Sequence, residues 1–171
     1  MKNIWAPWRY EYLSPSPRKR KGCIFCQADR TREDRKRLVL LREARSIVLL
    51  NLYPYTNGHL MIAPRIHASS PEEVDDATRA EIMEVLVRTQ RALRMEYRPD
   101  GWNVGLNLGR AAGAGIADHF HLHVVPRWAG DTNFMTVAAE TRVLSESLDA
   151  TWRKLRRRLR SGTGRSERRP R

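Results

Sequence analysis

Residues 119–125 read HFHLHVV, and this stretch decides how the rest of the chain is interpreted. Histidine alternates with apolar residues here. Because successive side chains of a β-strand point to opposite faces, an extended strand would place His119, His121 and His123 on one face and the apolar residues on the other. The chain has only 5 histidines, and by chance such a pattern arises roughly 0.004 times in a chain of this length. The stretch predicts a strand with a row of imidazoles on one face.

Three interpretations of such a row are open. The histidines could be ordinary core or surface residues, or they could be metal ligands, since histidine is the commonest metal ligand. Alternate strand residues stand about 6.6 Å apart, however, which makes it hard for all three to hold one ion. In the third interpretation, which we favour, a neutral imidazole attacks a phosphorus atom while its neighbours supply protons and positive charge to the oxygens.

A glycine-containing loop precedes the row. Gly109, Gly113 and Gly115 lie within it, and the backbone N–H groups of such loops are typical partners of phosphate oxygens. A glycine loop alone is weak evidence, but beside the histidine row it supports phosphorus chemistry.

Short apolar runs on both sides of this loop predict a sheet. Turn residues separate them, among them Asn57-Gly58 before the third run. The predicted strands are 38–41, 46–53, 59–64, 102–109 and 119–126.

Two helices complete the predicted fold. Ser70, followed by Pro71 and Glu73, is typical of a helix N-terminus, and apolar residues at spacings of three and four extend this helix to about residue 97. A second helix is predicted from about 146 to 160. The order of elements predicts an α+β fold with helices on one side of the sheet.

With its flanks, HFHLHVV resembles the HxHxHxx signature of the histidine-triad superfamily of nucleotide hydrolases and transferases, over about residues 22–135. The resemblance implies a five-stranded antiparallel sheet with one long and one C-terminal helix, and a homodimer. It also implies that His121 is the nucleophile that takes up a nucleoside monophosphate, and that His123 binds the phosphate and assists proton transfer. By the same resemblance, His59 is the fourth family histidine, Asn51 holds the ribose, and Asn107 lines the phosphate pocket.

The loop departs from the family pattern. Family members often carry Ser, Thr or Gln before the triad, whereas this chain reads GAGIAD at 113–118. The backbone N–H groups of Gly113 and Gly115 are therefore the predicted phosphate donors.

Two flanking segments, WAPWR at 5–9 and PRWAGDTNFM at 126–135, resemble the bacterial diadenosine tetraphosphate phosphorylase branch. This resemblance implies cleavage of dinucleoside polyphosphates with inorganic phosphate as acceptor, giving ADP and ATP. A hydrolase that uses water remains open, because either acceptor resolves a nucleotidyl-histidine. Trp128, Asp131, Asn133 and Phe134 would shape the second-nucleotide or acceptor pocket, with ordinary loop packing as the alternative.

Cys23 and Cys26 are the only cysteines, and their spacing is typical of half a zinc site. The zinc-bearing members of the superfamily, including galactose-1-phosphate uridylyltransferases, imply His67 and His119 as the remaining two ligands of a structural zinc. Reduced cysteines packed as small apolar residues, or a redox pair, are the alternatives.

Length and charge set the domain organisation. The 171 residues carry 32 Lys+Arg against 19 Asp+Glu, a net charge of +13. We expect an aromatic and basic arm over 1–21, one domain over 22–160 and a basic disordered tail over 161–171. Residues 153–171 hold 10 Lys+Arg and 1 Glu, so this segment could bind nucleic acid weakly. The alternative to an enzyme is a zinc-stabilised nucleic-acid-binding protein without catalysis. With no signal peptide, no membrane span and two cysteines, the sequence predicts a cytoplasmic protein.

Overall fold

The computed structural model describes residues 22–131 and 146–161. The predicted arm over 1–21 and the predicted tail beyond Ser161 lie outside the described residues. None of the helices within the described ranges combines the length and the apolarity that a membrane span requires.

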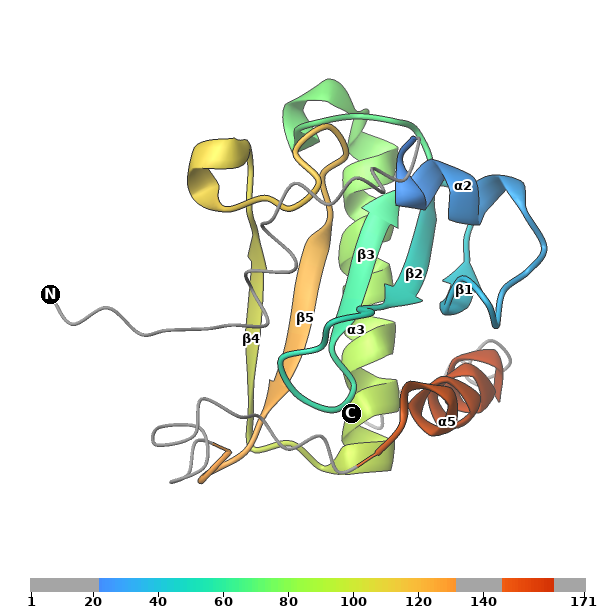
Figure 1. Cartoon of the computed structure of the whole chain (residues 1–171), viewed down its shortest axis with the longest axis vertical. Helices are drawn as coiled ribbons and strands as arrows, with labels where there is room; N and C mark the ends of the chain where they lie inside the picture. The colour runs from blue at the N-terminus through green and yellow to red at the C-terminus, as the bar shows by residue number, and fades with distance from the viewer. Residues whose placement is uncertain (1–21, 132–145, 162–171) are drawn as a thin grey trace, which may run out of the picture.

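A five-stranded antiparallel sheet forms the centre of the molecule, which confirms the predicted α+β class (Figure 1). The strand order is β1-β2-β3-β5-β4. The strands are β1 Val39–Arg42, β2 Ser46–Leu50, β3 Leu60–Pro64, β4 Gly101–Leu106 and β5 Leu122–Arg127. Each predicted strand is present, but β5 begins three residues later than predicted, so only His123 of the histidine row lies within it.

The long helix α3 (Asp76–Tyr97) covers one face of the sheet. Alternation along β3 and β5 sends one set of apolar side chains into this layer, where Leu60 and Ile62 pack with Phe120 and Leu122. The helix ends at Arg98, which adopts a left-handed conformation (φ +47°) ahead of Pro99.

The predicted start of this helix at Ser70 is wrong. Ser70 caps only a short 3-10 turn, η1 (Pro71–Glu73), because Val74 is extended. Asp75 provides a second cap, accepting a hydrogen bond from the Thr78 N–H at 2.8 Å.

The other face is covered on its β1–β3 side by a short helix that the sequence did not predict, α2 (Ile24–Arg30) (Figure 1). Phe25 and Ala28 are buried beneath it against the second set of strand residues, including Met61 and Ala63. Arg42 on β1 stabilises the end of α2 by donating to the carbonyl oxygens of Ala28 (2.7 Å) and Thr31 (2.8 Å). This second face carries the histidine row.

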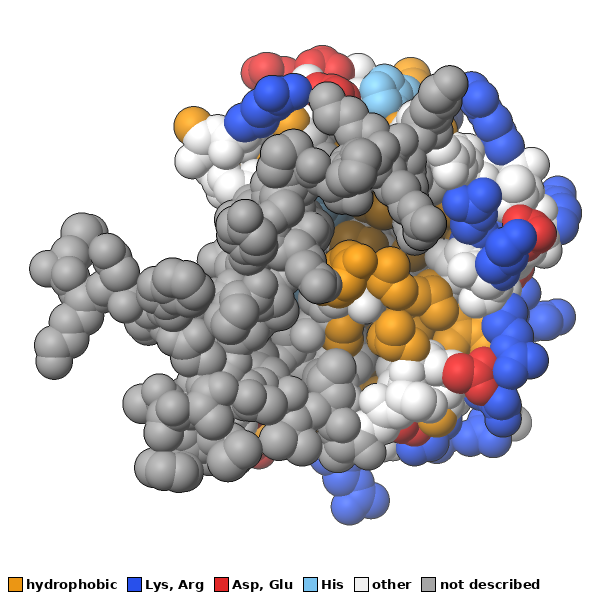
Figure 2. Space-filling view, in the orientation of Figure 1, with side chains coloured by type: hydrophobic (Ala, Val, Ile, Leu, Met, Phe, Trp, Pro, Cys, Tyr) orange, Lys and Arg blue, Asp and Glu red, His pale blue; other side chains and the backbone are white. Residues whose placement is uncertain are grey.

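The C-terminal helix α5 (Leu148–Ser161) lies beside the edge strand β1, close to the predicted 146–160. Trp152 and Arg156 both donate to the carbonyl oxygen of Val39 (2.8 and 2.9 Å). Arg156 and Arg158 also pair with Asp34 and Glu96. Part of the basic C-terminal charge therefore stabilises the domain, and Figure 2 shows other Lys and Arg side chains along the same side of the molecule.

A short 3-10 turn, η2 (Arg110–Ala112), lies in the loop between β4 and β5. This loop carries the glycines that precede the histidine row.

Candidate active site and metal centre

All five histidines gather where β3, the start of β5 and α2 meet. His59 directly precedes β3, while His119 and His121 directly precede β5. His59, His119 and His121 are buried, with 1%, 0% and 6% of their surface exposed. Phe25 of α2 contacts the rings of His119 and His121 at centroid distances of 5.0 and 4.9 Å. The predicted one-sided row is therefore present, and it separates into two groups.

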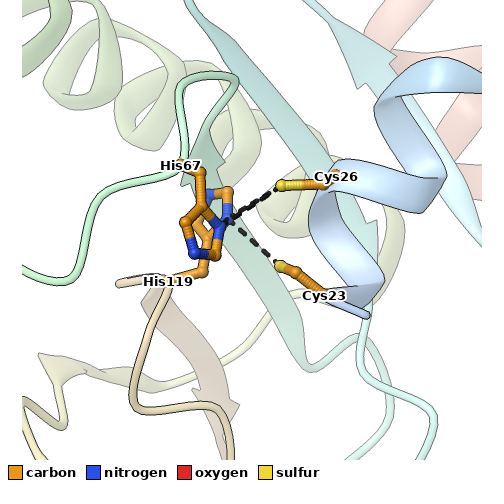
Figure 3. Close-up of side chains that lie close together, drawn as sticks. All are labelled: Cys23, Cys26, His67 and His119. Atoms are coloured by element: carbon orange, nitrogen blue, oxygen red, sulfur yellow. Dashed lines mark hydrogen bonds between the residues drawn. The ribbon is translucent and has the colours of Figure 1, made fainter. Parts of the chain in front are cut away.

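The first group is the metal cluster, which we define as Cys23, Cys26, His67 and His119 (Figure 3). All four ligand atoms lie within 4.8 Å of one another. The Nδ1 atom of His119 lies 3.2 and 3.6 Å from the two sulfurs, and that of His67 lies 3.4 Å from Cys26 Sγ. The two Nδ1 atoms are 3.2 Å apart.

These separations fit a tetrahedral zinc. Bonds of about 2.3 Å to sulfur and about 2.0 Å to nitrogen give tetrahedral edges of about 3.6 Å between S and N and about 3.3 Å between two nitrogens. Burial, and then contact with the Cys23 thiol, raise the pKa of Cys26, so the protein alone does not stabilise the thiolate. A cation among the four ligand atoms would.

The ring orientation of His119 also fits a metal ligand. Its Nε2 lies 2.9 Å from the carbonyl oxygen of Pro64. Because a carbonyl only accepts, Nε2 carries the proton and Nδ1 presents its lone pair to the cluster. Burial lowers the pKa of His119 below its ordinary value, which keeps the ring neutral.

The second group is the relay, which we define as His59, His121 and His123. In His121 the nitrogen roles are reversed relative to His119. Its Nδ1 donates to the backbone carbonyl of His119 at 3.0 Å, so the lone pair resides on Nε2. Burial lowers the pKa of His121, and the ring is therefore a neutral potential nucleophile near pH 7.

His59 fixes the tautomer of His123. The backbone N–H of Tyr55 donates to His59 Nδ1 at 3.2 Å, so His59 carries its proton on Nε2. That Nε2 lies 3.0 Å from His123 Nδ1, whereas the Asn51 amide approaches it only to 3.5 Å. His123 Nδ1 thus accepts, and its Nε2 keeps an N–H. Burial, and then the neighbouring His121, lower the pKa of His123 to about 4.

A cavity of about 320 Å³ opens beside the relay, on the face formed by β4 and β5. His123 and Asn107 both line it, and the ring centroids of His123 and His121 are 4.8 Å apart. The structure therefore brings an N–H donor and a predicted phosphate-pocket residue to the cavity, and the ring of His121, which does not line the cavity, lies next to that of His123. The other lining residues are Tyr55, Thr56, Asn103, Val104, Gly105, Leu106, Val125, Arg127 and Asp131.

The remaining predicted binding residues are spread more widely. Asn51 lies beside His59 and accepts from the Tyr53 N–H at 2.9 Å. The Gly113 N–H donates to the Arg110 carbonyl (3.0 Å), so this predicted phosphate donor has a partner within its own turn.

Gly115 is exposed, and its N–H has no hydrogen-bond partner in the described part of the chain. The indole of Trp128 donates to the Tyr97 carbonyl at the end of α3 (3.2 Å), and Trp128 does not line the cavity. Asn133 and Phe134 lie outside the described residues.

Three residues at the site were not found by sequence reasoning. Phe25 packs between the two groups, Tyr55 stacks on His59 (4.9 Å between ring centroids), and Arg127 lines the far end of the cavity. Only Arg127 had a usable signal, because the alternation that places His119, His121 and His123 on one face continues to it through Val125.

Comparison with known proteins agrees with this geometry. The HIT domain model matches residues 32–130. The chain is 39% identical over 162 residues to an AP-4-A phosphorylase of Mycobacterium tuberculosis, covering 91% of this chain and 83% of the relative. It is 30% identical to an adenosine 5'-monophosphoramidase of Schizosaccharomyces pombe over 62% of this chain and 74% of that protein.

Among solved structures, a zinc-bound histidine triad family protein from Mycobacterium smegmatis superimposes with a TM-score of 0.66 at 26% identity, over 83% of this chain and 96% of that one. The histidine row, the antiparallel sheet and these matches lead to one conclusion: the chain belongs to the HIT family, the histidine triad proteins, a family of nucleotide-processing enzymes.

Proposed function

We propose that this protein is a nucleotidyltransferase that cleaves dinucleoside polyphosphates by phosphorolysis, converting diadenosine tetraphosphate and phosphate to ADP and ATP. The observation that carries the proposal is the contact between the ring of His121, whose Nε2 is bare, and the ring of His123, which carries an Nε2–H and lines the cavity. The mycobacterial relative, named an AP-4-A phosphorylase, supports the choice of substrate.

In the first step, His121 Nε2 attacks the α-phosphorus. A nitrogen–phosphorus bond forms, and the bond from phosphorus to the bridging oxygen breaks, so AMP is held on His121 and ATP leaves. The His123 N–H lies beside the reacting ring and donates a hydrogen bond to the departing oxygen, and ATP leaves as the anion without taking up a proton.

In the second step, an oxygen of inorganic phosphate attacks the same phosphorus. The attacking oxygen is an anionic one, so when the nitrogen–phosphorus bond breaks, ADP is released and His123 keeps its Nε2–H. His59 acts as a positioning residue, because its hydrogen bond at 3.0 Å keeps the His123 proton on Nε2. Asn107 lines the cavity, and it would hold phosphate oxygens together with the Gly115 N–H of the loop between β4 and β5, and Asn51 would hold the ribose.

We also propose that the metal cluster holds a structural zinc. Four protein ligands would leave no open position, so zinc bound here supplies structural stability and no reacting group. Cys23 and Cys26 would tie α2 to His119 just ahead of β5. Thiolate ligands agree with the proposed cytoplasmic, reducing location.

A homodimer through β4 completes the proposal. The two edges of the sheet differ, because α5 covers β1, whereas no described helix packs along β4. Val104, Leu106 and Leu108 are exposed at 40%, 37% and 42%, and an exposed apolar edge strand is suited to pairing with another strand. Light scattering after size exclusion should give twice the monomer mass for the wild type. The Val104→Lys variant should give a mass closer to that of the monomer.

The test of the reaction is an assay of the purified protein with diadenosine tetraphosphate, with and without inorganic phosphate. ADP and ATP formed only when phosphate is present support phosphorolysis. AMP and ATP formed without phosphate would instead identify a hydrolase. No turnover under either condition would overturn the substrate assignment.

A further inference from the structure

The cavity beside the relay continues as a groove along two strands. Its floor is made by alternate residues that share one face, namely His123, Val125 and Arg127 on β5, and Asn103 and Gly105 on β4. The relay lies at the His123 end. Arg127 is four residues further along β5, about 13 Å away at the usual rise of a strand.

Gly105 leaves the floor open beside His123. The sheet register pairs Gly105 directly with His123, and a Cβ built at Gly105 would meet nothing within 4 Å. A ligand can therefore extend from the relay along the strands without meeting a side chain at this position. At about 320 Å³, the cavity is at the lower end of the range for small-ligand sites, so it suits part of a dinucleotide.

Arg127 is held in place at the other end. Its Nε and Nη2 donate to the two carboxylate oxygens of Asp131 (2.5 and 2.7 Å), and its Nη1 donates to Asn103 Oδ1 (2.6 Å). Three of the five guanidinium N–H groups are thus used within the described chain, which leaves two for a ligand. Asp131 offsets part of the charge, but it also fixes the guanidinium plane, and a fixed guanidinium with paired N–H groups matches phosphate geometry.

The direction in which the leaving nucleotide departs connects the His123 end of the groove with the Arg127 end. An in-line attack by His121 expels the leaving group on the side of the phosphorus away from His121, and the neighbouring His123 N–H is the donor placed to hydrogen-bond it. The groove begins at His123, so the departing polyphosphate enters the groove. Arg127 is then the cation that its distal phosphates meet, and Asn103 is an adjacent amide.

We propose that the β4–β5 groove is a subsite for the distal phosphates of the leaving nucleotide, and that Arg127 sets the preference for long polyphosphate substrates. The inference rests on the proposed function and extends it, because it assigns a residue that discriminates substrates by the length of their phosphate chain. AMP and adenosine 5'-phosphoramidate have no distal phosphates and do not need the subsite.

The experiment compares the wild type with Arg127→Gln, Arg127→Lys and Arg45→Gln. Arg45 is a matched control, since it is an exposed arginine in the turn between β1 and β2 that also pairs with an aspartate, Asp75. We expect Arg127→Gln to raise the KM for diadenosine tetraphosphate about tenfold or more, as for loss of a charge-assisted hydrogen bond. The kcat/KM for adenosine 5'-phosphoramidate should not change. Arg127→Lys should be intermediate, because it keeps the charge and loses the fork.

Calorimetry with inorganic tripolyphosphate and with AMP gives a second measurement that does not depend on turnover. The Gln variant should bind tripolyphosphate about tenfold more weakly and AMP as tightly as the wild type does. Equal losses for long and short ligands would overturn the proposal by showing a merely structural role, and so would no loss for either. If the wild type fails to cleave diadenosine tetraphosphate, the proposed function fails, and the calorimetric comparison still decides whether the subsite exists.

Discussion

The metal cluster and the relay lie side by side on one face of the sheet, yet they present opposite nitrogens. In His119 the Pro64 carbonyl occupies Nε2 and directs the Nδ1 lone pair to the two thiols and His67. In His121, two residues later, the His119 carbonyl occupies Nδ1 and leaves Nε2 bare. The comparison teaches that the backbone acceptor beside each ring selects its chemistry, since the side chains are identical.

The two groups are also physically joined. His119 contributes its ring to the metal cluster and its carbonyl oxygen to His121. Phe25, which is fully buried, contacts both rings. If the two groups have separate roles, loss of His121 should abolish turnover and leave zinc in place, and a substitution in the metal cluster should remove zinc and reduce kcat by a smaller factor.

The largest expected effect comes from removing the bare nitrogen. His121→Ala should lower kcat on diadenosine tetraphosphate by roughly four orders of magnitude or more, because the covalent route is lost. Zinc content should stay at the wild-type level, as measured by emission spectrometry. In the wild type, a mass-spectrometric adduct of AMP on the peptide that contains residue 121 should accumulate when phosphate is withheld. Appreciable turnover by the Ala variant would refute the nucleophile assignment.

Truncation of Phe25, which contacts rings of both groups, should affect the metal cluster and the relay together. Phe25→Ala should reduce the free energy of unfolding by about 3–5 kcal/mol, as expected for truncation of a buried aromatic residue. Both zinc affinity and kcat should fall, because both rings lose a packing partner. Chemical denaturation measures the first effect, and Met83→Ala, which truncates an exposed side chain of α3, is the control. Loss of stability with both functions intact would show that the two groups do not depend on this contact.

The metal cluster can be tested through its exposed member. His67→Ala should lose zinc, lower the melting temperature and reduce kcat by about 10–100-fold, a range typical of partners that orient a site from outside. This loss is smaller than that for His121→Ala. His67→Cys should retain zinc and most of the activity, since three cysteines and one histidine form an accepted zinc site. Full activity in a zinc-free His67→Ala variant would show that the relay does not depend on the metal cluster.

The smallest predicted effect is on pH dependence. In the unfolded chain a histidine takes up its proton near pH 6.5, whereas the pKa of His123 is about 4 in the folded protein. Between these two pH values the unfolded state binds more protons than the folded state. The free energy of unfolding therefore has its full value above pH 6.5 and falls as the pH is lowered towards 4. His123→Asn should reduce that slope by about 1.4 kcal/mol per pH unit, and Arg45→Gln should leave it unchanged. If denaturant titrations gave the wild type and both variants the same change in the free energy of unfolding per pH unit, the lowered pKa of His123 would be contradicted.

Strong local signals explain which parts of the fold could be predicted. The five strands follow apolar runs bounded by turn residues, and α5 was placed within two residues at its start. The start of α3 was wrong because Ser70 and Asp75 are both good caps, and only packing decides between them. Helix α2 was missed because seven residues are too few to establish a helical period.

The site shows a similar division. The histidine alternation and the spacing of Cys23 and Cys26 drew attention to these residues, and the family resemblance implied the set Cys23, Cys26, His67 and His119 that the structure brings together. The nitrogen that His119 presents was not predictable, because it depends on the carbonyl oxygen of Pro64, 55 residues away in sequence. The alternation of β5 placed Arg127 on the histidine face, but its partner Asn103 comes from β4, and the pairing of β4 with β5 cannot be read from one strand.

Gly105 has a consequence for redesign of the enzyme. A residue without a side chain opposite His123, with open space where a Cβ would be, is a position at which a larger residue changes the reach of the groove and leaves every histidine in place. A series from alanine to valine to phenylalanine would shorten the accepted polyphosphate stepwise. A single substitution would then change the preference for polyphosphate length without changing the reacting histidines.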